Sequence, residues 1–253
     1  MTVSHAVLVA VAGLLCGAVN SIAGGGSLIL FPALLATGLS PLAANVTNST
    51  ATWPGYAGGL FGFRPELTDQ GPRIRPLVLA ALAGSAIGCV LLLSTPSAAF
   101  DVVVPLLIFL AAALLAFQPQ IKKLVGEPVE GNRVWTLQIP SMVAATIYGG
   151  YFGAALGVII LAVLAVTVPD TLRRLNALKG VVSFVTGSVS VVVFAIFGPV
   201  NWGFALVAAP MTLIGGYVGA RIARYVNETL LRWSVVGLGV VIAVYLFVRG
   251  LAP

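Results

Sequence analysis

The chain has 253 residues, of which 59% are hydrophobic and 8% charged, and its mean hydropathy is +1.08. A soluble globular domain carries about a quarter charged residues, so this composition excludes a water-soluble protein and indicates a lipid bilayer. The net charge of +6 would suggest nucleic acid in a soluble protein. Here the basic residues lie in short loops between apolar segments, where they set orientation, and we expect no nucleic-acid partner.

Apolar segments follow one another along nearly the whole chain, and a helix needs about 20 residues to cross roughly 30 Å of hydrocarbon. We expect membrane segments near residues 5–22, 26–38, 42–62, 76–95, 101–118, 135–152, 155–168, 175–198, 202–222 and 230–249. The segments at 26–38 and 155–168 are short for a full crossing. Met1 to His5 lacks the basic start of a signal peptide, so we expect the first helix to remain in the protein.

Two cysteines and several absent motifs limit the chemistry. Cys16 and Cys89 lie in apolar segments without a His or acidic neighbour, so they are expected to be small core residues and not metal ligands. The sequence has no G-x-x-x-x-G-K-[ST] loop for ATP. We therefore expect no metal, no other cofactor and no catalytic residue.

A constant spacing relates the two halves of the chain. The residue numbers of Asn45 and Asn176 differ by 131 (176 − 45), and each residue lies in an apolar segment. This difference, which we call the repeat spacing, also joins Asn48 to Lys179, Gly26 to Gly157, Gly84 to Gly215 and Gly88 to Gly219. The pattern predicts a tandem duplication of one membrane unit, with chance agreement among the 29 glycines as the alternative. We expect a first repeat over residues 1–119, a cytoplasmic linker over 120–133 and a second repeat over 134–253.

We compare two topologies by counting the Lys and Arg residues, 13 in all, that each topology places on either side of the membrane. If both short segments cross, 12 basic residues lie on or near one side and only Arg249 lies opposite. If both segments are re-entrant, the chain has eight full spans and the split is 7 to 6. The positive-inside rule favours the first arrangement, which places both termini outside the cytoplasm and makes each half five elements, hence inverted. The sequence thus predicts an all-α polytopic fold of two inverted repeats of four to five helices each. Short broken or half-depth helices lie near the midplane, and the number of full spans stays open between eight and ten.

The most irregular membrane segment contains Asn20, Gly24, Gly25, Gly26 and Ser27. Three successive glycines, each costing about 1 kcal/mol in a helix interior, favour a break in the helix. Backbone N–H groups freed at membrane depth are tolerated only where they are buried in protein or line a cavity. The helix that starts at Ser27 would then direct its positive end at an anion. A simple packing or turn cluster is the alternative.

Lys179 is the second candidate centre, because a lysine at membrane depth costs several kcal/mol unless it is paired or faces water. Every acidic residue lies in a loop or at the end of an apolar segment, so none is placed to pair with it at membrane depth. An anionic substrate would be a suitable partner, with Asn45, Asn48 and Asn176 supplying amide donors; the alternative is that Lys179 snorkels to the cytoplasmic interface. We expect these four residues and Thr52 to converge on one cavity between the halves.

With these motifs the chain resembles the TauE/SafE sulfite exporter family, also called the toluene-sulfonate uptake permease family. The resemblance lies in Ala18-Val19-Asn20-Ser21-Ile22-Ala23-Gly24-Gly25-Gly26-Ser27, Ala44-Asn45-Val46-Thr47-Asn48, Trp53-Pro54-Gly55, Tyr148-Gly149-Gly150-Tyr151-Phe152-Gly153 and Asn176-Ala177-Leu178-Lys179. It implies a membrane transporter of two related halves, often with about eight spans, that moves sulfite, sulfonates or other small organosulfur anions.

The sequence therefore favours a secondary transporter or facilitator for a small sulfur-containing anion in the cytoplasmic membrane of a bacterium. A permease or channel for another small anion or carboxylate is the alternative. An intramembrane enzyme would need a catalytic dyad at depth, and His5 alone does not supply one. A membrane scaffold without transport would leave Lys179 and the glycine break unexplained. Substrate identity, direction, coupling ion and oligomeric state stay open.

Overall fold

Every regular element of the protein is a helix in the computed structural model, which describes residues 2–120, 133–223 and 225–251. The helices are α1 (Val3–Ile22), α2 (Ser27–Ala36), α3 (Pro41–Gly62), η1 (Arg64–Leu67), α4 (Gly71–Ser94), α5 (Ser97–Ala116), α7 (Arg133–Tyr151), α8 (Leu156–Thr167), α9 (Leu172–Phe197), α10 (Trp202–Ile222) and α11 (Glu228–Leu251). The predicted all-α class is confirmed, with one helix for each predicted segment. The predicted linker at 120–133 falls almost wholly outside the described residues.

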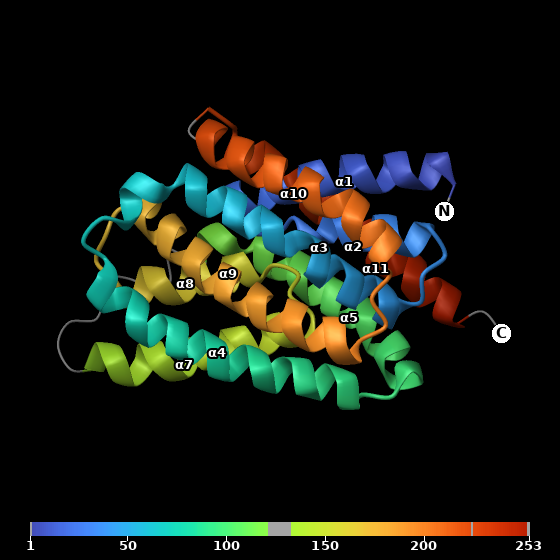
Figure 1. The fold of residues 1–253 in the computed structure, drawn as a ribbon, viewed down its shortest axis with the longest axis horizontal. Helices are drawn as coiled ribbons and strands as arrows, with labels where there is room; N and C mark the ends of the chain where they lie inside the picture. Colours follow the sequence, from blue (N-terminus) through green and yellow to red (C-terminus); the bar gives the residue numbers. More distant parts are fainter. Residues whose placement is uncertain (1, 121–132, 224, 252–253) are drawn as a thin grey trace.

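The helices lie side by side along the long axis of the molecule, and both termini are at the same end (Figure 1). Among the described residues, six helices are long and apolar enough to cross a membrane, by length and composition alone: α1, α4, α5, α9, α10 and α11. Helix α3 has 22 residues and α7 has 19, so both have the length to cross but are more polar. The short helices α2 and α8, of 10 and 12 residues, rise only about 1.5 Å per residue and are too short to span the bilayer.

The starts of the helices follow the repeat spacing found in the sequence. Helices α3, α4 and α5 begin at residues 41, 71 and 97, and their equivalents α9, α10 and α11 begin at 172, 202 and 228. The N-terminal caps agree as well, because Ser40 accepts a hydrogen bond from the backbone N–H of Ala43, and Thr171, at the equivalent position, accepts one from Arg174. A hydroxyl at this position satisfies one of the unpaired N–H groups of the first turn.

Helix packing follows the same correspondence. Helix α10 packs against α1 and α3, while α4 packs against α7 and α9, and α3 packs against α9 between them. Small residues make these contacts close, since a Cβ on Gly88 would overlap the Ile147 carbonyl oxygen of α7 and one on Gly219 would lie 2.6 Å from Ala18 Cα of α1. Small residues at these positions let neighbouring helices approach closely.

The breaks that precede the two short helices meet inside the protein. Gly24 has φ +89° and Ala155, its equivalent by the repeat spacing, has φ +57°. Both occupy the left-handed region, which costs a residue with a Cβ about 1–2 kcal/mol, so glycine suits the first break better than alanine suits the second. A Cβ on Gly24 would lie 2.9 Å from Gly157 Cα. The two breaks are therefore in backbone contact.

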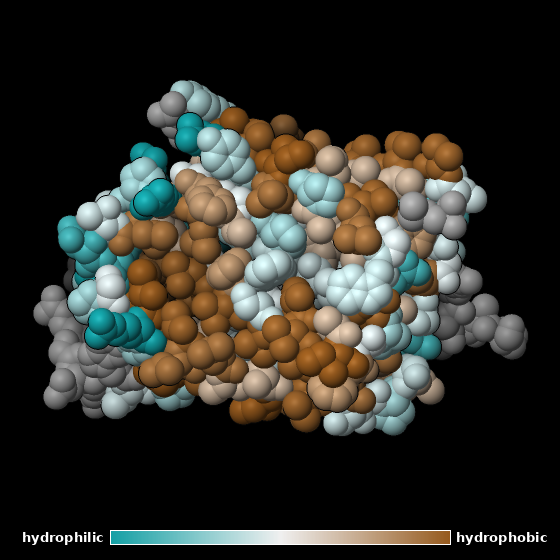
Figure 2. Space-filling model, viewed as in Figure 1, coloured by the Kyte–Doolittle hydropathy of each residue, from teal (hydrophilic) through white to brown (hydrophobic). Residues whose placement is uncertain are grey.

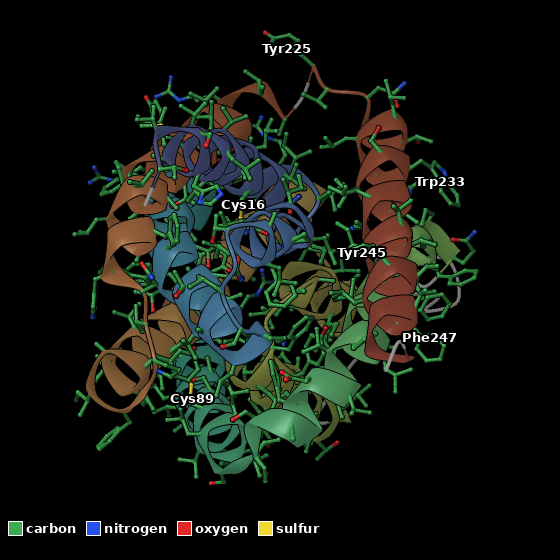
Figure 3. All side chains as sticks on the ribbon, turned by 90° about the vertical axis from the view of Figure 1, so that its right-hand side faces the viewer. Cys16, Cys89, Tyr225, Trp233, Tyr245 and Phe247 are labelled. Carbon is green, nitrogen blue, oxygen red and sulfur yellow. The ribbon has the colours of Figure 1, made fainter. Side chains whose placement is uncertain are left out.

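Hydrophilic residues gather at the end of the molecule opposite to the termini, and an apolar band covers its middle (Figure 2). Helix α11 stands beside the rest of the bundle, with Trp233 and Phe247 on its outer side and Tyr245 facing inward (Figure 3). A large groove of about 1210 Å³ lies between α1, α2, α5 and α11, and apolar side chains dominate its lining. Cys16 and Cys89 are both 0% exposed free thiols, consistent with their predicted role as core residues.

Candidate functional site

The Lys179 ammonium group lies within the protein and not at an interface. The residue is 3% exposed, and its Nζ atom donates hydrogen bonds of 3.2 Å to the backbone carbonyls of Asn20 and Ser21. These carbonyls belong to the last turn of α1, where the helix dipole is negative. Lys179 thus ties α9 to the end of α1, and the alternative that it snorkels to the surface does not fit its burial.

The glycine break beside Lys179 is held by a side chain. Asn20 Oδ1 accepts a 2.8 Å hydrogen bond from the Gly26 N–H, while the N–H groups of Leu28 and Ile29 bond to the carbonyls of Gly25 and Gly26. Most donors at the start of α2 therefore have partners inside the protein. Ser27, the first residue of α2, is 3% exposed, and it lines a small cavity.

Six of the ten predicted site residues line two small cavities, whereas Gly24, Gly25, Gly26 and Asn45 line neither. The first, of about 10 Å³, is lined by Ser27, Asn48 and Thr52, together with Thr186 and Ser190 of α9. The second, of about 20 Å³, is lined by Asn20, Ser21, Asn176, Lys179 and Ser183. We name them the Asn48 cavity and the Lys179 cavity. Tyr56 lines both cavities.

The residues that line the two cavities are related by the repeat spacing. Asn48, Ser49 and Thr52 line one cavity, and their equivalents by the repeat spacing, Lys179, Gly180 and Ser183, line the other. Each half of the chain therefore contributes the same part of one helix, α3 or α9. The two cavities differ in their chemistry, because Lys179 in one cavity occupies the position that Asn48 occupies in the other.

Polar atoms without partners mark both cavities. Among the described residues, the buried Oδ1 atoms of Asn48 and Asn176 and the Thr186 hydroxyl have no hydrogen-bond partner. Unpaired buried polar groups of this kind cost about 1–3 kcal/mol each and are expected where a ligand or water completes the set. The Thr52 hydroxyl, in contrast, bonds to the carbonyls of its own helix, as threonines in membrane helices commonly do.

Asn45 and Asn176 occupy equivalent positions but different surroundings. Asn45 is 1% exposed, lines neither cavity, and donates a 2.9 Å hydrogen bond to the Tyr151 carbonyl at the end of α7. Asn176 is only partly buried and lines both the Lys179 cavity and a wider opening beyond it. The structure thus groups Asn176 with Lys179 and holds Asn45 apart from them.

That wider opening, which we call the basic vestibule, has a volume of about 730 Å³. Arg64, Arg173 and Arg221 line it and are exposed. Its inner end is formed by Phe63 and Asn176, which also line the Lys179 cavity. With one carboxylate, Glu66, against three arginines in its lining, the vestibule has a net positive charge where it adjoins the Lys179 cavity.

Ion pairs lie around the rim of the vestibule. Asp170 pairs with Arg73 at 2.7 Å and with Arg174 at 3.2 Å, and Glu66 pairs with Arg173. These contacts link the start of α4 and η1 to the start of α9. Arg64 and Arg221 take part in none of these ion pairs, although Arg221 lies 5.0 Å from the centre of the Tyr217 ring.

Sequence reasoning missed Tyr56, Thr186 and Ser190. The repeat spacing offered a signal for the first, because it pairs Tyr56 with Gly187, a large residue with the smallest. The hydroxyls of α9 carried no such signal. In the described part of the chain no three His, Cys, Asp or Glu side chains gather as a metal site would require.

The chain is similar to known membrane proteins over most of its length. The family model for the sulfite exporter TauE/SafE matches residues 9–246. The chain belongs to the TauE/SafE family. It is 28% identical over 226 residues to a probable membrane transporter protein of Haemophilus influenzae, covering 88% of this chain and 87% of that one.

Two further relatives are a probable membrane transporter protein of Sinorhizobium, 25% identical over 93% of this chain and 90% of the relative, and one of Escherichia coli K12, 25% identical over 88% and 82%. No solved structure matches the chain. The protein is a multi-pass membrane transporter of the TauE/SafE family, not an enzyme, and it functions with a lipid bilayer and a transported substrate.

Proposed function

We propose that this TauE/SafE protein moves a small sulfur-containing anion, such as sulfite or an organosulfonate, across the cytoplasmic membrane of a bacterium. The observation that carries the proposal is the basic vestibule, which adjoins a cavity containing the buried Lys179. A cation that faces polar side chains at depth favours an anionic ligand. Asn20, Asn176 and Ser183 line the same cavity and offer groups that suit sulfite or sulfonate oxygens.

We further propose that the two halves, residues 1–119 and 134–253, are inverted repeats. Helices α1 and α7 run in opposite directions along the long axis (Figure 1), and the equivalent helices make equivalent contacts. Both chain ends lie at the opposite end of the molecule from the start of α9 and from the hydrophilic residues gathered there (Figures 1 and 2). The positive-inside rule then orients the vestibule toward the cytoplasm, with both termini outside.

The different surroundings of the equivalent asparagines support transport by alternating access. Asn45 closes one side by bonding to the Tyr151 carbonyl, and Asn176 lines an open vestibule on the other. In an inverted repeat, exchanging these two arrangements would open the opposite side. The structure would then be a state that opens toward the cytoplasm.

Anion flux in liposomes tests the proposal. Purified protein reconstituted with radiolabelled sulfite, or with a small organosulfonate, is expected to give uptake that saturates and that empty liposomes lack. Competition by unlabelled acetate, phosphate and chloride ranks the alternative anions. Flux of a small carboxylate in preference to every sulfur anion would favour the rival permease, and no flux of any anion would contradict the proposal.

The vestibule arginines provide a second prediction. Arg64→Gln with Arg221→Gln should lower uptake from the vestibule side several-fold at low ionic strength, because the positive field that steers the anion is weakened. The difference should shrink as salt approaches 1 M, where the screening length falls to about 3 Å. Arg75→Gln is the matched control for either substitution made singly, since each removes one charge and Arg75 is exposed outside the vestibule. An equal effect of the control variant would show that net charge alone matters.

A further inference from the structure

Tyr56 separates the two cavities. In the described part of the chain it is the one residue that lines both the Asn48 cavity and the Lys179 cavity. Its equivalent on α9 by the repeat spacing is Gly187, and a Cβ on Gly187 would lie 3.2 Å from Cδ2 of the Tyr56 ring. The absence of a side chain at residue 187 therefore leaves the recess in which the ring lies.

A rigid aromatic pair borders this recess. Trp53 and Phe184 are also equivalent by the repeat spacing, and their rings stack with centroids 5.5 Å apart and an interplanar angle of 22°. Trp53 is fixed further by a 2.8 Å hydrogen bond from Nε1 to the Ser188 hydroxyl. Since two equivalent residues contact each other, α3 and α9 cross at this point, and Tyr56 lies one turn beyond it at the junction of the two halves.

Neither cavity is large enough for the proposed substrate. A cavity needs about 10–15 Å³ to hold one water, and the two cavities measure about 10 and 20 Å³. Sulfite has four heavy atoms and a sulfonate has more, so neither fits in either cavity as it stands. An anion that passes from Lys179 to Asn48 must displace the Tyr56 side chain.

We propose that Tyr56 is the movable partition of the transport path and that the pair Tyr56 and Gly187 sets the largest anion that passes. The inference rests on the proposed function, since it names the residue that divides the same site. An anion held at Lys179 would cross the ring to reach Asn48, whose Oδ1 atom lacks a partner among the described residues, and the hydroxyls of Thr186 and Ser190.

Cysteine accessibility tests the partition without requiring transport. In a background of Cys16→Ala and Cys89→Ala, Ser49→Cys reports on the Asn48 cavity and Ser183→Cys on the Lys179 cavity. An anionic methanethiosulfonate reagent is added from the vestibule side of membranes that contain the full chain. With Tyr56→Ala, modification of Ser49→Cys should accelerate about tenfold or more, equivalent to about 1.4 kcal/mol of barrier, while the rate at Ser183→Cys should change less than about twofold.

Two further variants are compared with the parent. Tyr56→Phe retains the ring and should leave both modification rates as in the parent. Tyr56→Leu, of intermediate size, should give an intermediate rate at Ser49→Cys, and it replaces the alanine variant if that variant does not fold. An unchanged rate at Ser49→Cys in a folded Tyr56→Ala or Tyr56→Leu protein would overturn the partition.

Flux separates this inference from the proposed function. In liposomes, Tyr56→Ala should carry benzenesulfonate at least about tenfold faster than the parent, whereas sulfite flux should persist. A parent protein that carries no sulfur anion refutes the proposed function, and the accessibility rates then still decide the partition. If the parent carries sulfite, and if the parent and Tyr56→Ala exclude benzenesulfonate equally, the partition alone is refuted.

Discussion

Lys179→Met is expected to abolish anion transport while leaving the protein folded in the membrane. The substitution removes the buried cation of the Lys179 cavity. Truncating one partner of a buried charge pair costs about 2–5 kcal/mol, so the anion should bind about 30-fold more weakly or worse at 1.4 kcal/mol per tenfold. The measurement is initial uptake of sulfite or of a small sulfonate into liposomes, at concentrations that span the parent's saturation.

Stability should fall modestly, because two opposed effects partly cancel. Lys179 donates to the carbonyls of Asn20 and Ser21, and bonds from a charged donor contribute about 1.5–3 kcal/mol each. Methionine avoids the cost of placing a lysine at membrane depth, about 2.5–3.5 kcal/mol on insertion scales. Thermal unfolding in detergent measures the balance.

Lys179→Arg is the control, since it keeps the charge and should retain part of the flux. Normal transport by Lys179→Met would remove the lysine from the substrate site. If both variants fail to fold, the role of Lys179 is solely structural, through its hydrogen bonds to the end of α1.

Gly26→Ala is expected to destabilise the fold more than any other single methyl addition near the site. A Cβ at residue 26 would overlap the Cys16 carbonyl oxygen and lie 2.9 Å from Asn20 Cγ. The backbone of α1 cannot yield without breaking the bond from the Gly26 N–H to Asn20. Overpacking of this kind costs about 3 kcal/mol, which corresponds to a fall of roughly 6–12 °C in Tm.

Gly71→Ala is the matched control, because an added Cβ there would meet nothing within 4 Å. Thermal unfolding followed by fluorescence-detected gel filtration compares the two variants with the parent. Equal stability of Gly26→Ala and Gly71→Ala would show that the break at α1 and α2 is loosely packed, contrary to the geometry.

Sequence patterns predicted the helices well, because apolar length and loop residues determine where a chain crosses a bilayer. The boundaries shifted where polar residues extend a helix into water. Helix α4 begins at Gly71 instead of the expected residue 76, since Pro72 suits the first turn and Arg73 bonds to Asp170. The repeat spacing was visible as well, because duplicated positions keep the residues that their backbone requires.

The sequence could not predict how the polar residues divide between cavities. Asn45 and Asn176 are alike in sequence, yet one bonds to Tyr151 and the other lines the vestibule. This difference arises from the conformation of the whole protein and not from local residues. The glycine break was identified from the sequence. Composition does not reveal, however, that Asn20 Oδ1 accepts the hydrogen bond of the Gly26 N–H across the break.

The most direct test of the account is to locate a bound anion. Selenite has the shape and charge of sulfite, and its selenium gives an anomalous signal in crystals grown in its presence. We expect a selenium peak within about 4 Å of Lys179 Nζ, the range of an ion pair, in a Lys179 cavity enlarged by displacement of Tyr56, and no peak in Lys179→Met. A peak only in the apolar groove between α1, α2, α5 and α11, or one at the same place in Lys179→Met, would contradict it.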